Sequence, residues 1–284
     1  VRERVLVCEG AMGSMLARKG VRVRNTAEAN LTHPAVVGEV HREYQEAGAE
    51  VFQTNTFSAN LPMLERAGLA ERAAELQAEA VRILRQAVGE EGYVGLNLGP
   101  TGELLAPLGE LSVDQAIGVY RQQIGAMLPL GVDFILGETF EALEEAEAAV
   151  RAAKELAPDL PLAITLSFSL SNGRTSMGVS GRMAAERLIG LGVDIIGANC
   201  GSPEGLLRAF GEMAAVAGDR VLLAQPNAGV PVLRGEETVF DGTPGWSGET
   251  AARLIELGAR IVGGCCGTTP DHIRQIARAA RASA

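Results

Sequence analysis

Aromatic side chains, histidines and positive charge are all scarce in this chain of 284 residues. Aromatic residues make up 4% of it, too few for the stacking platforms on which proteins bind single-stranded nucleic acid. The formal net charge is −10, whereas a surface that binds a phosphate backbone is usually basic. We therefore expect no nucleic-acid partner.

Long apolar segments are also missing. No apolar run approaches the ~20 residues that span a bilayer, and the first residues hold no apolar stretch as long as that of a secretory signal peptide. We expect no membrane partner and a cytoplasmic location. In such a reducing compartment, the four cysteines are expected to be thiols, metal ligands or nucleophiles and not disulfides.

The chain is instead built from short apolar segments that alternate with longer amphipathic ones. The apolar segments are rich in Val and Ile and are typical of buried parallel strands. Strands are expected at residues 5–8, 50–53, 93–98, 133–136, 162–168, 194–198, 220–224 and 260–263. The spacing of apolar residues predicts helices at 69–88, 112–130, 141–156, 203–217, 247–257 and 271–282. Four glycines just before strands suit the left-handed residue that ends a helix: Gly48, Gly131, Gly192 and Gly258.

Eight strands in strict β–α order predict an α/β fold, a (β/α)8 TIM barrel formed as a single domain by residues 1–284. An open doubly wound sheet shows the same alternation and is the alternative. Two features favour the barrel: eight units fit its closure, and Gly10 and Gly13 are too closely spaced for the dinucleotide-binding Gly-rich turn that follows the first strand of many open sheets.

Polar residues occur at the carboxyl end of every predicted strand, which is where barrel enzymes carry their catalytic groups. Each of them alone is compatible with an ordinary hydrogen-bonded loop residue, but their presence at all eight ends is harder to explain in that way. They are Glu9, Thr54, Asn97, Glu138, Ser167, Asn199, Gln225 and the pair Cys265–Cys266.

Three of the cysteines lie at these ends. Cys200 follows the sixth strand, and Cys265 and Cys266 follow the eighth, so barrel closure brings them within reach of one ion. Adjacent residues of a regular strand point to opposite faces, and the flanking glycines 263, 264 and 267 permit the turn that directs both sulfurs inward. Three thiolates suit Zn2+, and three protein ligands leave its fourth position open, as in a catalytic site.

The alternatives for these cysteines are a vicinal disulfide, a single nucleophile, or buried thiols without a role. Cys8 lies inside the first predicted strand and is interpreted as a core residue. The three histidines, His33, His41 and His272, lie on helical segments and are expected to be away from the strand ends, which predicts a site with sulfur ligands only.

Seven motifs together resemble the homocysteine S-methyltransferase family. They are EGAMGS at 9–14, TNTF at 54–57, GPTG at 99–102, ETF at 138–140, GANCG at 197–201, PNAGVP at 226–231 and GGCCGTTP at 263–270. The resemblance extends from about residue 5 to the C-terminus. Within the family it is closest to the homocysteine-binding domain of cobalamin-dependent methionine synthase, and modules fused to methylenetetrahydrofolate reductase are also similar. One departure is Glu9, because the first motif of the family usually begins Asp-Gly.

The resemblance implies a zinc-dependent methyltransferase in which Cys200, Cys265 and Cys266 bind Zn2+ and are the catalytic ligands. The homocysteine sulfur then becomes the fourth ligand, and Asn227 takes that position in the resting state. The substrate ammonium is expected to pair with Glu138. The remaining substrate-binding residues expected are Glu9, Thr54, Asn55 and, through their backbone N–H groups, Gly10, Ala11, Met12 and Gly13.

The methyl donor has no recognisable site in the sequence. We therefore expect methylcobalamin in trans or on another domain, with folate and cobalamin domains of a larger methionine synthase as partners. The alternatives are a free-standing enzyme that uses S-methylmethionine or betaine, a module fused to methylenetetrahydrofolate reductase, and a non-catalytic module that binds zinc or thiols.

Overall fold

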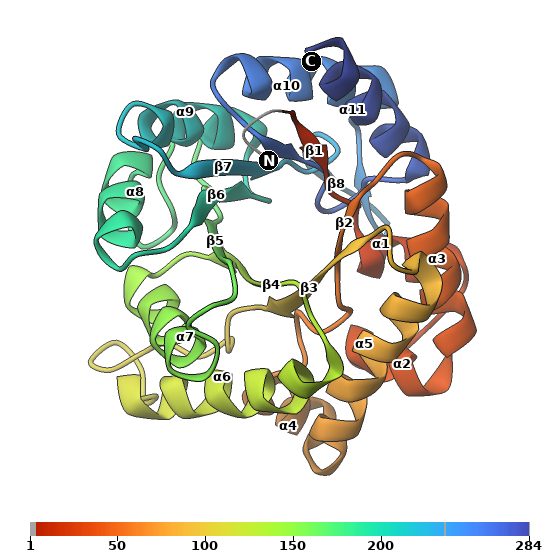
Figure 1. Ribbon diagram of the computed structural model, residues 1–284, viewed down its shortest axis with the longest axis vertical. Helices are drawn as coiled ribbons and strands as arrows, with labels where there is room; N and C mark the ends of the chain where they lie inside the picture. The colour runs from red at the N-terminus through yellow and green to blue at the C-terminus, as the bar shows by residue number, and fades with distance from the viewer. Residues whose placement is uncertain (1–3, 236, 284) are drawn as a thin grey trace.

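A computed structural model describes residues 4–235 and 237–283 of the chain. Eight parallel strands form a central ring, and the helices surround it (Figure 1). Their order around the ring is β1-β10-β7-β6-β5-β4-β3-β2. Their bounds are β1 (Leu6–Val7), β2 (Val51–Gln53), β3 (Tyr93–Leu98), β4 (Phe134–Phe140), β5 (Leu162–Leu166), β6 (Ile195–Asn199), β7 (Val221–Gln225) and β10 (Ile261–Val262).

The ring closes between its first and second strands. Cys8 forms a parallel bridge with Val51, Glu9 N–H donates to Val51 O at 3.0 Å, and Glu50 N–H donates to Val7 O at 2.8 Å. An open sheet would leave these two edges unpaired. The predicted (β/α)8 barrel is therefore confirmed.

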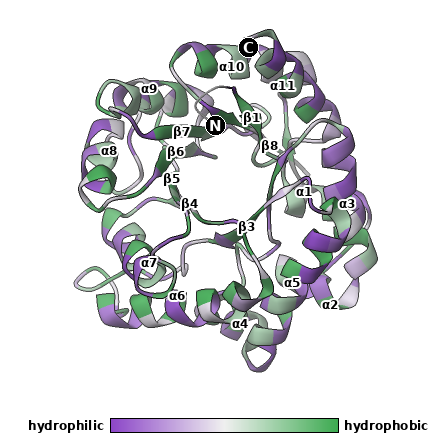
Figure 2. Ribbon diagram, viewed as in Figure 1, coloured by the Kyte–Doolittle hydropathy of each residue, from purple (hydrophilic) through white to green (hydrophobic). Residues whose placement is uncertain are grey.

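The helices present apolar faces to the barrel and polar faces outward (Figure 2). In α7, for example, the buried positions are mostly Ala, which lets this helix pack closely on the sheet. The helices are α1 (Met12–Arg18), α2 (Ala29–Thr32), α3 (Pro34–Glu46), α4 (Leu61–Ala67), α5 (Ala73–Val88), α6 (Val113–Met127), α7 (Leu143–Leu156), α8 (Gly181–Gly190), α9 (Pro203–Ala214), α10 (Pro244–Glu256) and α11 (Pro270–Ala282), with short 3-10 helices η1 (Thr26–Glu28), η2 (Ala70–Arg72) and η3 (Leu128–Leu130).

The helix ends follow the predicted pattern. Gly48, Gly131, Gly192 and Gly258 all have positive φ, between 73° and 107°, as expected of residues that end helices. The six predicted helices are present with shifted bounds; the segment 69–88, for example, begins with η2 before α5. No bounds were predicted for α1–α4 and α8, or for an antiparallel hairpin of β8 (Pro231–Arg234) and β9 (Glu237–Phe240).

Alternate strand residues point into the barrel, and their character changes along its axis. Toward the amino ends they form an apolar cluster of Leu6, Cys8, Val51, Phe134, Leu136, Ala163, Leu223 and Ile261. Two residues further along four of these strands come Gln53, Glu138, Thr165 and Gln225. The barrel is thus filled by apolar side chains below and by a polar layer at its carboxyl ends, on which the site is built.

The apolar part of this filling accounts for Cys8. Its side chain is fully buried, and burial raises the pKa of its thiol well above the ordinary value. The interpretation of Cys8 as a core residue is confirmed.

Candidate metal centre

Cys200, Cys265 and Cys266 meet at the carboxyl ends of β6 and β10. Their sulfur atoms all lie within 4.8 Å of one another, and this is the group that could hold a metal ion in the described part of the chain. Three sulfurs bound to one Zn2+ at ~2.3 Å with tetrahedral angles would be about 3.8 Å apart. The three side chains therefore fit Zn2+, and all four cysteines are free thiols, so there is no vicinal disulfide.

Backbone hydrogen bonds to the end of β7 hold the three cysteines. Cys200 N–H donates to Gln225 O at 3.0 Å, and Cys265 N–H donates to Pro226 O at 2.9 Å. Ala228 N–H donates in turn to Cys266 O at 2.9 Å. The segment after β7 therefore acts as the support against which both cysteine loops are placed.

The glycines around the cysteine pair mainly allow neighbouring atoms to approach the backbone closely. An unusual backbone dihedral angle is a smaller part of their role. A Cβ on Gly263 would lie 2.4 Å from the Cβ of Cys8, and one on Gly264 would lie 2.5 Å from Thr268 Cγ2. Of the three flanking glycines, Gly267 is the one with positive φ, +79°. A Cβ on Gly267 would also lie 2.4 Å from Phe240 Cγ. The predicted turn is present, and neighbouring atoms leave no room for a side chain at any of its three glycines.

Without a metal, the three thiols share protons through sulfur–sulfur hydrogen bonds. Hydrogen bonds from Cys265 and Cys266 lower the pKa of Cys200, which favours a thiolate at that position. That thiolate in turn raises the pKa of Cys265 and of Cys266. Three thiols that compete for one negative charge are expected to release their protons together only when a cation binds among them.

Glu138 lies beside this centre, within β4 and not after its end. The strand was expected to end at residue 136 but continues to Phe140, with an irregular register between Gly137 and Phe140. The side chain is 7% exposed and accepts hydrogen bonds from Asn97 Nδ2 at 2.7 Å and Asn199 Nδ2 at 3.1 Å. Burial raises the pKa of this carboxyl to about 7. Its hydrogen-bond partners are these two amides, and no positive side chain of the described residues pairs with it.

Glu9 is held differently. Its Oε1 accepts from Gln53 N–H at 2.7 Å, and its Oε2 lies 2.8 Å from Nδ1 of His41. His41 belongs to α3, so the expectation that the histidines stay away from the strand ends was wrong for this residue. The ring reaches inward from the helix and is fully buried, as is Glu9. The substrate-binding role of Glu9 stays a prediction, and the structure shows that protein groups already engage both carboxylate oxygens.

Asn227 lies at the centre, but its nitrogen faces the cysteines. Its Nδ2 donates to Gly201 O at 3.0 Å, and its hydrogen bond to Cys200 helps to lower the pKa of that thiol. The oxygen Oδ1 is buried and has no hydrogen-bond partner. An amide with an unpaired buried oxygen beside three thiols suits the predicted resting-state metal ligand, provided that the amide group flips so that Oδ1 faces the sulfurs. That role stays a prediction.

The first motif, residues 9–14, is connected to the cysteine loop by hydrogen bonds of Thr268. Its Oγ1 accepts from Ala11 N–H at 3.1 Å and donates to Cys265 O at 2.7 Å. The following helix, α1, begins at Met12 with no side-chain cap. The segment Gly10–Gly13 thus adjoins the centre, and its role toward a substrate carboxylate stays a prediction.

The side chains of Thr54 and Asn55 form hydrogen bonds within the fold. Thr54 Oγ1 accepts from Asn97 N–H at 3.0 Å, and Asn55 Nδ2 donates to Thr26 O and to Asn30 Oδ1, away from the cysteines. Their predicted contact with substrate stays untested. The residues that site prediction omitted are His41, Asn97, Asn199 and Thr139. Asn97 and Asn199 were visible as polar strand ends, whereas nothing in the sequence signalled that a ring on α3 reaches Glu9.

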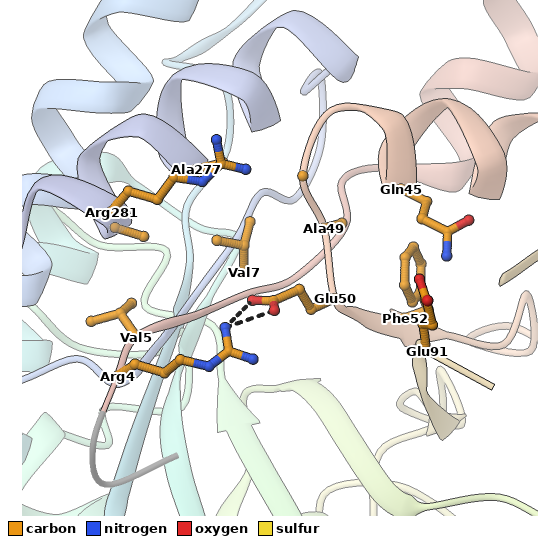
Figure 3. Close-up of a pocket in the computed structure, with 12 residues that line it drawn as sticks. Arg4, Val5, Val7, Gln45, Ala49, Glu50, Phe52, Glu91, Ala277 and Arg281 are labelled. Atoms are coloured by element: carbon orange, nitrogen blue, oxygen red, sulfur yellow. Dashed lines mark hydrogen bonds and ion pairs between the residues drawn. The ribbon is translucent and has the colours of Figure 1, made fainter. Parts of the chain in front are cut away.

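Several cavities lie elsewhere in the described part of the chain, and two of them are close to the ends of the barrel. One of about 400 Å³ opens at the amino ends of the strands, where Arg4 and Glu50 form an ion pair (Figure 3). The other, of about 640 Å³, lies at the carboxyl ends between the connections that follow β3, β4 and β5. It is lined by Thr139, Glu141, Glu144 and Glu145 together with apolar side chains such as Leu108. This second cavity adjoins Glu138 through Thr139.

None of the helices in the described part of the chain has both the length and the hydrophobicity of a membrane span.

The chain is similar to known methyltransferases over most of its length. It is 33% identical to methionine synthase of Mycobacterium leprae over 300 residues and 34% identical to that of Mycobacterium tuberculosis over 297 residues. Each alignment covers 98% of this chain, which spans about a quarter of the length of these relatives. The fold is also that of the homocysteine methyltransferase MmuM from Escherichia coli in its metallated form, with a TM-score of 0.81 at 24% identity over 97% of this chain and 96% of that one. The sequence model of homocysteine S-methyltransferases matches residues 6–280, and the chain therefore belongs to the homocysteine S-methyltransferase family.

Proposed function

We propose that this barrel binds homocysteine as a zinc thiolate and methylates it to methionine. The observation that carries the proposal is the convergence of three thiols within 4.8 Å of one another, beside a buried carboxyl that pairs with no positive side chain of the described residues. Cys200, Cys265 and Cys266 would hold Zn2+, which when bound supplies the charge that removes the proton from a substrate thiol. We propose the same role for the whole segment 1–284 as one domain, in a reducing cytoplasm.

Glu138 supplies the second point of recognition. Its carboxyl gains a counter-ion when the substrate ammonium arrives, and the ammonium compensates the burial that disfavours the charged form. Asn97 and Asn199 hold the carboxylate in place from two sides. The sulfur and the ammonium of homocysteine would then be bound at two separate places, which orients the acceptor sulfur toward an incoming methyl group.

We further propose that the donor is methylcobalamin carried on another domain and loaded from methyltetrahydrofolate. Two observations support this donor. The relatives at 33–34% identity are methionine synthases about four times as long as this chain. The loops at the carboxyl ends of the barrel also expose apolar side chains, among them Leu108 (67% exposed) and Leu233 (73% exposed), as expected where another protein surface must approach.

A small cationic donor is the second candidate. The cavity of about 640 Å³ beside Thr139 combines carboxylates with apolar side chains, which is a suitable lining for a sulfonium or quaternary ammonium compound. Incubation of the reduced, zinc-loaded protein with homocysteine and each donor in turn separates the candidates. Methionine formed with methylcobalamin supports the first, and methionine formed only with S-methylmethionine or betaine replaces it with the second. Binding without turnover of any donor would favour a thiol-binding module.

The ligand assignment is tested by Cys265→Ala. We expect this variant to lose stoichiometric zinc, measured by elemental analysis, and homocysteine binding, measured by calorimetry. Cys8→Ala is the matched control, because it removes a buried sulfur from the same chain and keeps the Cβ that packs near Gly263. Retention of one zinc per chain by Cys265→Ala would remove this cysteine from the ligand set.

A further inference from the structure

We propose that Asn199 is a positioning residue that couples the two ends of the acceptor site, the sulfur centre and the carboxylate of Glu138. The proposal rests on the proposed function and extends it to a residue that contacts neither a metal nor the acceptor. Asn199 is the last residue of β6, directly before Cys200, and its side chain is fully buried.

The orientation of the Asn199 amide is determined by its neighbours. Thr139 N–H, which can only donate, lies 2.9 Å from Oδ1. Thr165 Oγ1 also donates to Oδ1, at 2.7 Å. The opposite assignment would place an NH2 group against a backbone N–H. The oxygen therefore faces Thr139 and Thr165, and Nδ2 faces the site.

The nitrogen side of the amide reaches both ends of the site. Nδ2 is 3.1 Å from Glu138 Oε2, 2.7 Å from Thr139 Oγ1 and 3.8 Å from Cys265 Sγ. Its two hydrogens thus serve a carboxylate, a hydroxyl and a sulfur. Since the side chain is fully buried, water cannot replace these partners, and the amide holds the carboxylate and the sulfur at a set separation.

The backbone around the same amide is strained. Among the described residues, Thr139 (φ 65°) and Cys200 (φ 57°) are the two non-glycine residues with positive φ. Each directly follows a member of the pair Glu138–Asn199, and the amide oxygen holds the N–H of Thr139. Such conformations cost free energy and persist where surrounding contacts impose them. The bond from Thr139 N–H to Asn199 is one such contact.

Two consequences follow for a bound cation and a bound amino acid. An N–H that points to a metal-bound thiolate withdraws some of its charge, so the amide tunes the sulfur centre from outside the ligand set. The same NH2 group orients Glu138 toward the substrate ammonium. Loss of the Asn199 amide should therefore weaken both metal binding and homocysteine binding. Loss of a residue that contacts Glu138 but no sulfur should weaken homocysteine binding only.

Asn97 provides the matched comparison. Its Nδ2 donates to the other oxygen of Glu138 at 2.7 Å, it is 4% exposed, and it has the same chemistry as Asn199. We expect Asn97→Ala to raise the Kd for homocysteine while the zinc affinity stays within about 2-fold. We expect Asn199→Ala to raise both, with a loss of about 10- to 100-fold in metal affinity, as is typical when a hydrogen-bond partner of a ligand is removed.

The measurements are zinc competition against a chromophoric chelator, homocysteine calorimetry, and the sulfur-to-metal charge-transfer band of the Co2+-loaded protein. A merely structural role would not move that band, whereas loss of an N–H to Cys265 should shift it. Asn199→Asp is the second variant in case Asn199→Ala does not fold, because it keeps an acceptor for Thr139 and Thr165 and loses the donor.

Wild-type zinc affinity and an unshifted Co2+ band in the Asn199 variants would overturn the proposal. The wild-type protein separates this failure from that of the proposed function. If it binds metal but no homocysteine, the proposed function fails, and the zinc and Co2+ readouts still decide whether Asn199 acts on the sulfur centre.

Discussion

Replacing Glu138 by Gln should make the metal-free protein more stable at alkaline pH. Burial raises the pKa of Glu138 from 4.5 to about 7, so the folded protein holds this proton over a range in which the unfolded chain has released it. A raised carboxyl pKa means that stability is lost as pH rises. The penalty is absent below pH 4.5, grows between 4.5 and 7, and is complete above 7. A neutral amide escapes it.

The size of the effect follows from that pKa. A difference of about 2.5 pH units, at about 1.4 kcal/mol per unit, amounts to about 3 kcal/mol. The carboxylate accepts from Asn97 and Asn199, and an amide has one oxygen for these two donors. The lost hydrogen bond costs about 1 kcal/mol. We expect a net gain of roughly 2 kcal/mol at pH 8 and no gain at pH 5.

The assay is urea unfolding of the reduced, metal-free protein at both pH values. Glu145→Gln is the control, because Glu145 is also buried but its Oε1 accepts from Thr101 N–H, Thr101 Oγ1 and Tyr120 Oη. Since these three donors favour a charged acceptor, that substitution should give no gain in stability at pH 8. An equal loss of stability at pH 5 and pH 8 in Glu138→Gln would refute the reasoning. Glu138→Gln should also bind homocysteine more weakly, because it removes the charge that pairs with the substrate ammonium. A gain in stability together with a loss of binding would indicate that the carboxylate serves a ligand.

Two further substitutions test the supports of the site. Gly264→Ala places a Cβ 2.5 Å from Thr268 Cγ2 and 2.6 Å from its Oγ1, so it should displace the loop of Cys265. The zinc content, measured by elemental analysis, should then fall. Gly118 has open space around it, so the control variant Gly118→Ala should keep its full zinc content. His41→Leu leaves Oε2 of Glu9 buried without its partner and should lower the free energy of unfolding by about 1–3 kcal/mol in urea. His33→Leu, at an exposed position, should change it by less than about 0.5 kcal/mol, and equal losses in the two variants would show that the Glu9 contact is not what matters.

The barrel could be predicted because its strands are buried on both faces and stand out as apolar runs. The hairpin of β8 and β9 could not, because its first strand is exposed, with Leu233 at 73%, and carries no such pattern. The cysteines could be placed because they follow strands directly. Glu138 was expected after a strand that in fact runs past it, since the register shift beyond Gly137 depends on pairing with β5 and not on local sequence.

The contact between His41 and Glu9 shows a limit of another kind. Helical periodicity places His41 on the buried side of α3, but it does not say how far the ring reaches or what it meets. The unpaired oxygen of Asn227 is of the same kind, because it is defined by what surrounds it. Such contacts between distant segments follow only from the assembled barrel.

Several unfavourable features of the described chain lie together at the carboxyl end of the barrel. A buried carboxyl with a raised pKa, two residues in left-handed conformations, an amide oxygen without a partner and three thiols that compete for one charge all lie around Glu138, Asn199 and Asn227. A divalent cation among the sulfurs and an ammonium at Glu138 would compensate the charge-related ones together. Ligand binding stabilises a protein in proportion to its preference for the folded state. Zinc and homocysteine added together should therefore raise the unfolding temperature of the wild-type protein more than that of Glu138→Gln, whose carboxylate penalty is already removed.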